Sequence, residues 1–504
     1  MTKWKLAGST AIVLTMGTHA ALADVTPEEV WQNWQDTSTA YGQTIAAESA
    51  VRDGDTLVVT GVSITMDQDG GSTKAMIDEV DFTDLGDGTV EVTMSDAYAF
   101  SMTVPATDGG AATTLSISVT APDASTIASG TKDATNYDFS MPTLGIKLDS
   151  IEGVDAAAVN ATAEANLTGV IGSYLVEADG ASKKLMSDFA ADSVALTIAG
   201  TDPAGPSDVK VSASMLDLAG NSSVNMLDMA AMADMASALK AGFALDAAFT
   251  FGATTYDIAV SDASGPTSVK GASASGEFGL AMDADGLSFA SGSKGVSLAV
   301  SGAQIPFPEV KLTYAESAFE FSMPLSKSDA PADFSVLAKL IDFGVSDEIW
   351  GMVDPGAALP HDPATLVIDT KGTVTLTSDL TETAAMEAMG STPPGQLNSF
   401  DLTELHAKIA GADLTGTGAF TFDNTDMTTF AGMPAPTGKV DLKITGLNGL
   451  IDKLVAMGML PEDQAMQGRM MLSMFANPGA AADEMTSTLE FKDRHFYANG
   501  QQLQ

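Results

Sequence analysis

Side chains that could carry out chemistry are few in this chain and poorly spaced for it. A Ser-x-x-Lys tetrad, in which the lysine could activate the serine, begins at Ser129, Ser207 and Ser291. The companion Ser-Asp-Asn and Lys-Thr-Gly motifs of enzymes that use such a tetrad do not follow. The chain has no cysteine, no Gly-x-Ser-x-Gly elbow and no phosphate-binding glycine loop. We therefore predict a non-enzymatic protein with no catalytic residues. A hydrolase with paired carboxylates stays open, because 66 acidic residues offer no way to choose a pair from sequence.

Metal-binding patterns are equally sparse. His361, His406 and His495 are far apart in the sequence and form no His-x-x-x-His pair, so a zinc site is not predicted. Asp67-Gln68-Asp69-Gly70 and Asp283-Ala284-Asp285-Gly286 resemble the start of a calcium loop but lack its later ligands and closing glutamate. Aspartate and glycine are also common turn residues, which explains both segments more simply. We predict no metal and no cofactor, with specific calcium binding as the alternative.

Two groups of apolar side chains are candidates for contact with a hydrophobic ligand. Trp31 and Trp34 lie in an expected N-terminal helix. A second helix is expected over Asn225 to Ala241, and its apolar stripe contains Met226, Met229, Met232 and Met235. Both groups also have a structural interpretation. The tryptophans could pack the helix over a sheet or close one end of it, and methionine stripes usually form adaptable core.

The elements expected to position these residues are mostly strands. In Thr113 to Thr120, Leu115, Ile117 and Val119 alternate with small hydroxyl residues. A strand directs successive side chains to opposite faces, so this segment has one apolar and one polar face. The alternation returns in Thr89 to Met94, Ser193 to Ile198, Val296 to Val300, Thr373 to Thr377 and Lys439 to Thr445. We predict a mainly β fold: an elongated, curved antiparallel sheet, groove-like or trough-like, built of repeated hairpins with a few peripheral helices.

Internal repetition supports the hairpin architecture. The segment from Ile198 to Lys210 aligns with the segment from Ile258 to Lys270, 60 residues later, with seven of thirteen positions identical. A Phe-Ser-Met triplet begins at Phe100, Phe139 and Phe321. These imperfect repeats favour a sheet that is extended one hairpin unit at a time.

Three regions are expected along the chain. Residues 1–23 read as a signal peptide, residues 24–325 as an N-terminal helix followed by a β-repeat region, and residues 326–504 as a C-terminal β region. The last region is expected to contain a helix over Phe334 to Ile341, a strand pair over Ala364 to Asp369 and Thr373 to Leu380, and a helical pair over Leu450 to Met457 and Pro461 to Phe475. The turn from Lys492 to His495 predicts a terminal hairpin.

The first residues indicate export. Lys3 and Lys5 precede a short apolar run, and Ala21-Leu22-Ala23 is a small-residue cleavage pattern, so we expect cleavage after Ala23 and a periplasmic location. An uncleaved membrane anchor is the alternative, although the run is shorter than a span of roughly 20 residues requires. No later segment is expected to span a membrane. The net charge of −43 excludes nucleic acid as a partner, because such a surface repels phosphate.

Three segments carry a family resemblance. Leu359 to Leu366, Gly446 to Leu454 and Asn499-Gly500-Gln501, together with the opening Val30 to Trp34, resemble an uncharacterised family of Gram-negative envelope proteins, Domain of Unknown Function 2125. That family implies no activity and no catalytic residues. More loosely, the repeated strands and terminal hairpin are similar to AsmA-type envelope proteins, in which a long curved sheet forms an apolar groove linked to lipid handling. Because its opening segment is expected to be cleaved, this chain is expected to lack their retained membrane anchor.

Two functions follow as hypotheses. In the first, the protein is a periplasmic envelope protein that binds or shields lipid or another hydrophobic ligand in an apolar β-groove. In the second, it is a scaffold with a closed β core that binds other envelope proteins and no ligand. A sheet with one apolar face must bury that face against something, and the two hypotheses differ in what covers it.

Overall fold

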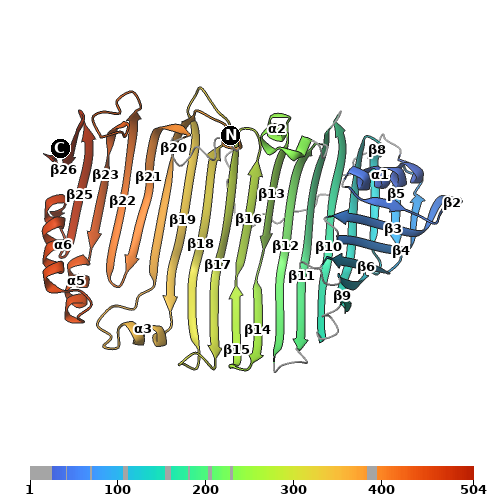
Figure 1. Ribbon diagram of the computed structural model, residues 1–504, viewed down its shortest axis with the longest axis horizontal. Helices are drawn as coiled ribbons and strands as arrows, with labels where there is room; N and C mark the ends of the chain where they lie inside the picture. The colour runs from blue at the N-terminus through green and yellow to red at the C-terminus, as the bar shows by residue number, and fades with distance from the viewer. Residues whose placement is uncertain are drawn as a thin grey trace.

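One antiparallel sheet dominates the protein (Figure 1). The computed structural model describes residues 25–503 except 41, 69–70, 106–111, 154–159, 180–181, 202–206, 228–230 and 383–393. Strands make up 66% of the structure and helices 12%. These proportions confirm the predicted mainly β fold built of hairpins with a few peripheral helices.

The strands fall into three groups along the chain. The N-terminal group is β1 (Thr44–Ala46), β2 (Ser49–Asp53), β3 (Thr56–Gln68), β4 (Gly71–Asp84), β5 (Val90–Met94), β6 (Ala97–Val104), β7 (Thr113–Thr120) and β8 (Ser125–Thr131). The middle group is β9 (Ala134–Glu152), β10 (Asn160–Asp179), β11 (Ser182–Thr201), β12 (Asp208–Met226), β13 (Ala244–Phe251), β14 (Thr254–Asp262), β15 (Gly265–Ser273), β16 (Ser275–Met282), β17 (Gly286–Gly302), β18 (Val310–Pro324) and β19 (Ala332–Val345). The C-terminal group is β20 (Ala364–Leu376), β21 (Gly395–Ile409), β22 (Ala412–Asp423), β23 (Ala435–Thr445), β24 (Asn477–Pro478), β25 (Glu484–Lys492), β26 (His495–Ala498) and β27 (Gln501–Gln502).

Neighbouring strands in the sheet are mostly neighbours in the sequence. β9 to β12 pair in order, and β12 then pairs with both β13 and β14, which continue one another. β16 and β15 stand next to them in the same way, and both pair with β17. From β17 to β23 the pairing is again sequential, and β25 and β26 complete the far end. β18 and β19, on either side of residue 325, are direct partners.

The sequence repeat lies on consecutive hairpins of this sheet. Ile198 of β11 is paired with Val211, Val211 with Ile258 of β14, and Ile258 with Val269. The two equivalent isoleucines therefore stand on one row that crosses the strands. Repetition of the hairpin unit keeps equivalent side chains in register across the sheet.

A line of left-handed residues crosses the middle strands. Leu167 and Val170 of β10 belong to one apolar cluster although they are three residues apart, a spacing that puts side chains on opposite faces of a regular strand. Gly169 lies between them with φ 61°. The same arrangement recurs at the same level of β12, β17 and β19, with positive φ at Asp217 (51°), Gly295 (61°) and Asp342 (54°). Each left-handed residue resets the alternation, so apolar side chains return to the same face beyond it.

Helix α1 (Pro27–Ala40) closes the N-terminal end of the sheet. Trp31 packs against Phe82 of β4 with ring centroids 5.8 Å apart, and Trp34 approaches the same ring at 5.3 Å. The helix begins as predicted. The Thr26 amide donates to the Glu29 carboxylate at 3.0 Å, and the Glu29 amide donates to Thr26 Oγ1 at 3.3 Å, which together form a capping box.

Loss of this cap is expected to weaken α1. Thr26→Ala leaves the Glu29 amide without its side-chain acceptor and should lower the free energy of unfolding by about 1 kcal/mol. Urea unfolding followed by tryptophan fluorescence measures the change. Thr26→Ser retains the hydroxyl and serves as the control; equal destabilisation by serine and alanine would contradict the capping role.

Helix α2 (Met235–Lys240), with the short 3-10 turn Ala231–Ala233 before it, lies at the ends of the middle strands (Figure 1). Ala238 and Leu239 are buried there with Phe243, and the side chains of Leu245 and Met282 pack against them. Lys240 Nζ lies 2.8 Å from Asp379 and ties the helix to the turn after β20. The predicted helix over Asn225 to Ala241 begins too early, because β12 extends to Met226. Within the described residues of that segment, the α-helix is Met235–Lys240.

Helix α3 (Asp347–Val353) leads into a loop organised by a buried carboxylate. The side chain of Asp354 is 1% exposed and accepts hydrogen bonds from the amides of Leu359 at 2.6 Å and Ala358 at 2.9 Å. His361 Nε2 lies 3.3 Å from the same carboxylate, and its ring stacks on Trp350 with centroids 4.3 Å apart. The Leu359 amide, followed by Ala358 and His361, holds the pKa of Asp354 below its ordinary value of 3.8.

Helices α5 (Leu447–Ala456) and α6 (Glu462–Phe475) pack at the C-terminal end of the sheet (Figure 1). They confirm the predicted helical pair, and β25 with β26 confirms the terminal hairpin. Two other predictions are wrong. Phe334 to Ile341 is not a helix but part of β19, and the predicted strand pair after it is a single strand, β20. No helix within the described ranges is long and apolar enough to cross a membrane.

Candidate functional site

One face of the sheet carries an almost continuous row of apolar side chains. Directly paired residues share a face, so the register identifies the row without further assumption. From β9 to β25 it contains Phe139, Gly172, Phe189, Gly220, Phe249, Phe278, Ser291, Phe319, Ala338, Ile368, Leu405, Gly416, Leu442 and Ser487. We call this side of the sheet the apolar face. At the usual strand separation the row is roughly 60 Å long.

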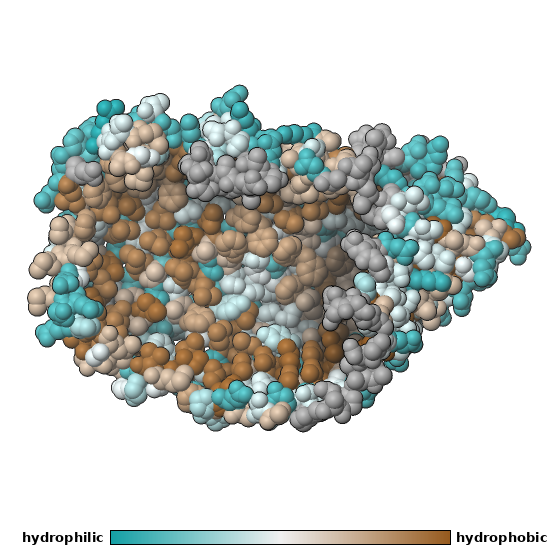
Figure 2. Space-filling model, in the orientation of Figure 1, coloured by the Kyte–Doolittle hydropathy of each residue, from teal (hydrophilic) through white to brown (hydrophobic). Residues whose placement is uncertain are grey.

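Much of the apolar face is open to solvent. Large side chains on it that are between 36% and 45% exposed are Phe189, Ile198, Val209, Tyr256, Phe278, Phe319, Val336, Leu366 and Ile368. Figure 2 shows apolar residues gathered over the middle of this view, with hydrophilic residues along its margins. A contiguous apolar area of this kind usually marks an interaction surface.

Glycines shape the apolar face. A Cβ on Gly172 would stand 2.6 Å from the ring of Phe139, and one on Gly372 would stand 2.7 Å from the ring of Phe334. The rings of Phe139 and Phe334 therefore extend over glycines of the neighbouring strands, where no side chain competes for the space.

Aromatic rings form a connected group in the centre of the face. Phe278 and Phe289 meet edge to face at 5.3 Å, and Phe289 stacks on Phe321 at 5.8 Å. The Phe319 ring lies 6.1 Å from the rings of both Phe289 and Phe321. These four rings give the central strands a contact area suited to hydrocarbon.

The opposite side, which we call the polar face, carries the charges. The row adjacent to the apolar one contains Asp138, Ser173, Asp188, Asn221, Ala248, Gly279, Ala290, Glu320, Leu337, Asp369 and Glu404. Partial burial raises the pKa of Glu320, and the nearby carboxylates of Glu277 and Asp369 raise it further. The two faces thus differ as the alternating sequence predicts.

Removal of the Glu320 charge is expected to stabilise the protein at neutral pH. A carboxyl group whose pKa is raised by folding contributes stability below its ordinary value of 4.5, and that contribution is lost as the pH rises through the folded-state pKa. Glu320→Gln should therefore raise the free energy of unfolding at pH 7 by less than about 1 kcal/mol, which is seen as a higher melting temperature. The gain should disappear below pH 4.5. A gain of equal size at both pH values would contradict this account.

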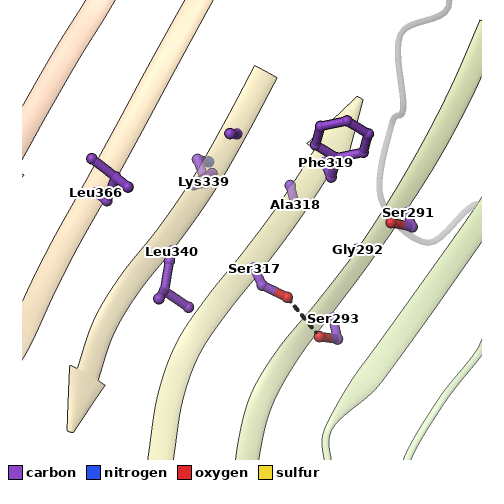
Figure 3. Close-up of a pocket in the computed structure, with 10 residues that line it drawn as sticks. Ser291, Gly292, Ser293, Ser317, Ala318, Phe319, Lys339, Leu340 and Leu366 are labelled. Atoms are coloured by element: carbon purple, nitrogen blue, oxygen red, sulfur yellow. Dashed lines mark hydrogen bonds between the residues drawn. The ribbon is translucent and has the colours of Figure 1, made fainter. Parts of the chain in front are cut away.

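A cavity of about 410 Å³ lies in the centre of the apolar face. Its borders are Ser291, Gly292, Ser293, Ser317, Ala318, Phe319, Ala338, Lys339, Leu340 and Leu366 (Figure 3). Ser293 Oγ and Ser317 Oγ lie 2.9 Å apart. Its volume is within the range of small-molecule sites.

A second cavity, of about 480 Å³, lies over β21 to β25 and is bordered by polar side chains. His406 Nε2 lies 3.2 Å from Asp413, and Lys443 Nζ lies 2.9 Å from Glu484. Thr488 Oγ1 donates to Asp441 at 2.6 Å. These polar groups are therefore paired with one another through hydrogen bonds and ion pairs. Across the described part of the chain, no three metal-ligating side chains gather into a potential ion site.

The predicted ligand-contact residues are spread over two places. Trp31 is 8% exposed and lies with Trp34 in the N-terminal core beneath α1. Met232 packs in the cluster under α2, Met235 is 38% exposed at the start of that helix, and Met226 is the last residue of β12. Met229 lies outside the described residues. Met226, Met232 and Met235 therefore lie near the ends of the middle strands and not among the aromatic rings at the centre of the apolar face.

The connected rings at the centre of the apolar face, Phe278, Phe289, Phe319 and Phe321, were not among the predicted site residues. Phe278 and Phe319 belong to different hairpins, and only the register shows that Ser291 separates them on one row. A partial signal was present in the Phe-Ser-Met triplets, because Phe139 and Phe321 both lie on the apolar face.

A second exposed apolar surface lies on α6. Met466, Met470, Met471 and Met474 are each between 59% and 64% exposed. Thioethers so exposed are expected to oxidise first. Mild peroxide treatment followed by peptide mass mapping should show sulfoxide on α6 before it appears at Met94, which packs against the N-terminal core. Earlier oxidation of Met94 would contradict the packing of that side chain against the core.

Comparison with known proteins gives one match. A family model described as "Uncharacterized protein conserved in bacteria (DUF2125)" matches residues 238–502. No curated protein and no solved structure matches the chain. The matched region contains three of the segments that carried the resemblance, Leu359 to Leu366, Gly446 to Leu454 and Asn499-Gly500-Gln501. The opening segment, Val30 to Trp34, lies before it. Because the match covers more than half of the 504 residues, the chain belongs to this bacterial family of uncharacterized proteins.

Proposed function

We propose that this protein is an exported, non-enzymatic component of the Gram-negative cell envelope that holds the acyl chains of a lipid against its apolar face. The observation that carries the proposal is the open centre of that face, where Phe278, Phe319 and Leu366 are each more than 40% exposed. Exposure of a continuous apolar row to water is unfavourable, and a bound hydrocarbon chain would remove the cost.

The chemistry of the face favours hydrocarbon as the ligand. The central row contains aliphatic and aromatic side chains, glycine, alanine and serine, and no charged residue. An acyl chain needs only apolar contact along its length, which such a row offers at every strand. The charges lie on the other side of the sheet, and the net charge of −43 disfavours an anionic partner.

The line of left-handed residues supports a trough shape for the binding surface. Irregular positions of this kind bend a strand and increase its twist. Here they occur at one level of the sheet, at Gly169, Asp217, Gly295 and Asp342. A bend at the same level in these strands would fold the apolar face along its length and shelter a bound chain from water.

Lipid binding can be tested directly. The mature chain is purified from envelope extract without added detergent, and bound lipid is sought by native mass spectrometry and solvent extraction. Saturable binding of a neutral fluorescent lipid, the methyl ester of cis-parinaric acid, is expected, with release of the probe by competing lipid. Failure of the probe to saturate, together with recovery of a stable protein partner and no lipid, would favour the scaffold hypothesis instead.

Export is a separate part of the proposal, supported by the opening signal sequence. Osmotic-shock fractionation is expected to release the protein with periplasmic markers. Its N-terminal residue should be Asp24. Retention of the chain with cytosolic markers and an intact Met1 would overturn the assignment without bearing on what the apolar face binds.

A further inference from the structure

The apolar face contains a group of polar side chains at the cavity between the aromatic rings and the leucines of β19 and β20. The row at this level runs from Phe251 through Gly276, Ser293, Ser317 and Leu340 to Leu366. Two adjacent hydroxyls therefore interrupt an otherwise apolar row at its centre. Figure 3 shows Ser293 and Ser317 facing each other within the cavity.

A third hydroxyl completes this group, and the three together are called the hydroxyl cluster. Ser293 Oγ lies 2.9 Å from Ser317 Oγ and 3.1 Å from Tyr314 OH. Three hydroxyl groups carry three protons, and these two hydrogen bonds use two of them. One O–H donor therefore stays available to a ligand. Ligand binding would remove the cluster from water, so an acceptor on the ligand is needed to avoid the cost of an unpaired donor.

The charge around the cavity selects the kind of acceptor. A carboxylate on the ligand would need a positively charged partner in the cavity, and the lysine that borders the cavity is already paired. Lys339 borders the cavity, but its Nζ lies 3.2 Å from Glu316 and pairs with that carboxylate. The adjoining strands carry Glu277 and Glu320 on the polar face, which makes the region unfavourable for an anion. A neutral carbonyl oxygen fits both the spare donor and the local charge.

We propose that the hydroxyl cluster binds the ester carbonyl of a neutral acyl lipid, with its chains lying on the flanking rows. This inference rests on the proposed function and specifies its ligand class. Phe278, Phe289 and Phe319 would contact hydrocarbon on one side of the carbonyl. Leu340 and Leu366 would contact it on the other side.

A matched pair of ligands tests the role of the carbonyl. Dioctanoylglycerol and its dioctyl ether analogue differ in the carbonyl oxygens and have similar hydrocarbon. Displacement of the methyl ester of cis-parinaric acid from the full mature chain measures both affinities. The ester is expected to bind about three- to tenfold more tightly, the effect of one neutral hydrogen bond. Equal affinities, or tighter binding of decanoate than of the ester, would overturn the inference.

Serine variants test whether the preference for the ester arises at the hydroxyl cluster. Ser293→Ala combined with Ser317→Ala should remove the preference for ester over ether. The control is Ser288→Ala combined with Ser322→Ala, because these serines form a similar pair 3.2 Å apart on the polar face of the same two strands. The control should retain the preference. An unchanged ratio in the first variant would refute the cluster's role.

The outcomes separate the two proposals. If neither glycerolipid displaces the probe and the probe itself does not saturate, the proposed function fails. If ester and ether bind equally, lipid binding stands and the carbonyl assignment fails. The comparison on the wild-type chain does not depend on whether a variant folds.

Discussion

Aspartate at both Phe278 and Phe319 is expected to weaken binding of the methyl ester of cis-parinaric acid by at least about 100-fold, or about 2.7 kcal/mol. The two rings are 44% and 45% exposed in the centre of the apolar face, so both positions can accept a polar side chain without disturbing a core. A bound acyl chain would have to cover two carboxylates and forfeit contact with two rings. Burial of an unpaired charge is among the largest penalties a binding site can carry.

The control for this variant is Ile171→Asp combined with Leu216→Asp. These side chains are 37% and 43% exposed, close to the values of the phenylalanines, and they project from the polar face of β10 and β12. Circular dichroism and melting temperature establish that both double variants are folded. If the two variants lose affinity equally, the apolar face is not the binding surface.

Phe82→Ala is expected to lower the free energy of unfolding by about 3–5 kcal/mol. The Phe82 ring is fully buried and is the common contact of Trp31 and Trp34, so its removal leaves a cavity under α1. Urea unfolding measures the loss, and the fluorescence of the two tryptophans reports release of the helix. Leu85→Ala, three residues away and 46% exposed, is the control and should change stability little. Similar losses for the two variants would show that α1 is not anchored through Phe82.

Alternation predicted strands well wherever one face is apolar and the other polar. Thr113 to Thr120 is β7 with the predicted bounds, and Thr26 with Glu29 starts α1 as predicted. The error at Phe334 to Ile341 has a physical reason. Its apolar residues, Phe334, Val336, Ala338 and Leu340, alternate with mixed residues that include Leu337 and Ile341, and this density imitates a helix face. Pairing with β18 and β20 on both sides decides the conformation.

The candidate site could not be predicted from local sequence, because it is assembled by register. Ser293 and Ser317 are separated by a hairpin and meet only because β17 and β18 pair at that level. Spacing rules also fail at the left-handed residues. Leu167 and Val170 share a face because Gly169 interrupts the period, and a regular strand would place them on opposite sides. The sequence predicts that an apolar face exists, and pairing determines which side chains meet on it.

The register of the repeated hairpins has a consequence for how such a protein can change in size. Ile198 and Ile258 lie on one row, two strands apart. The sheet is therefore built of repeated hairpin units, and each unit adds two strands to its width. Gain or loss of one whole unit would alter the span by roughly 10 Å and leave each remaining row aligned. Chains with more or fewer hairpin units would therefore differ in the length of the apolar face while the contacts within each unit stay the same.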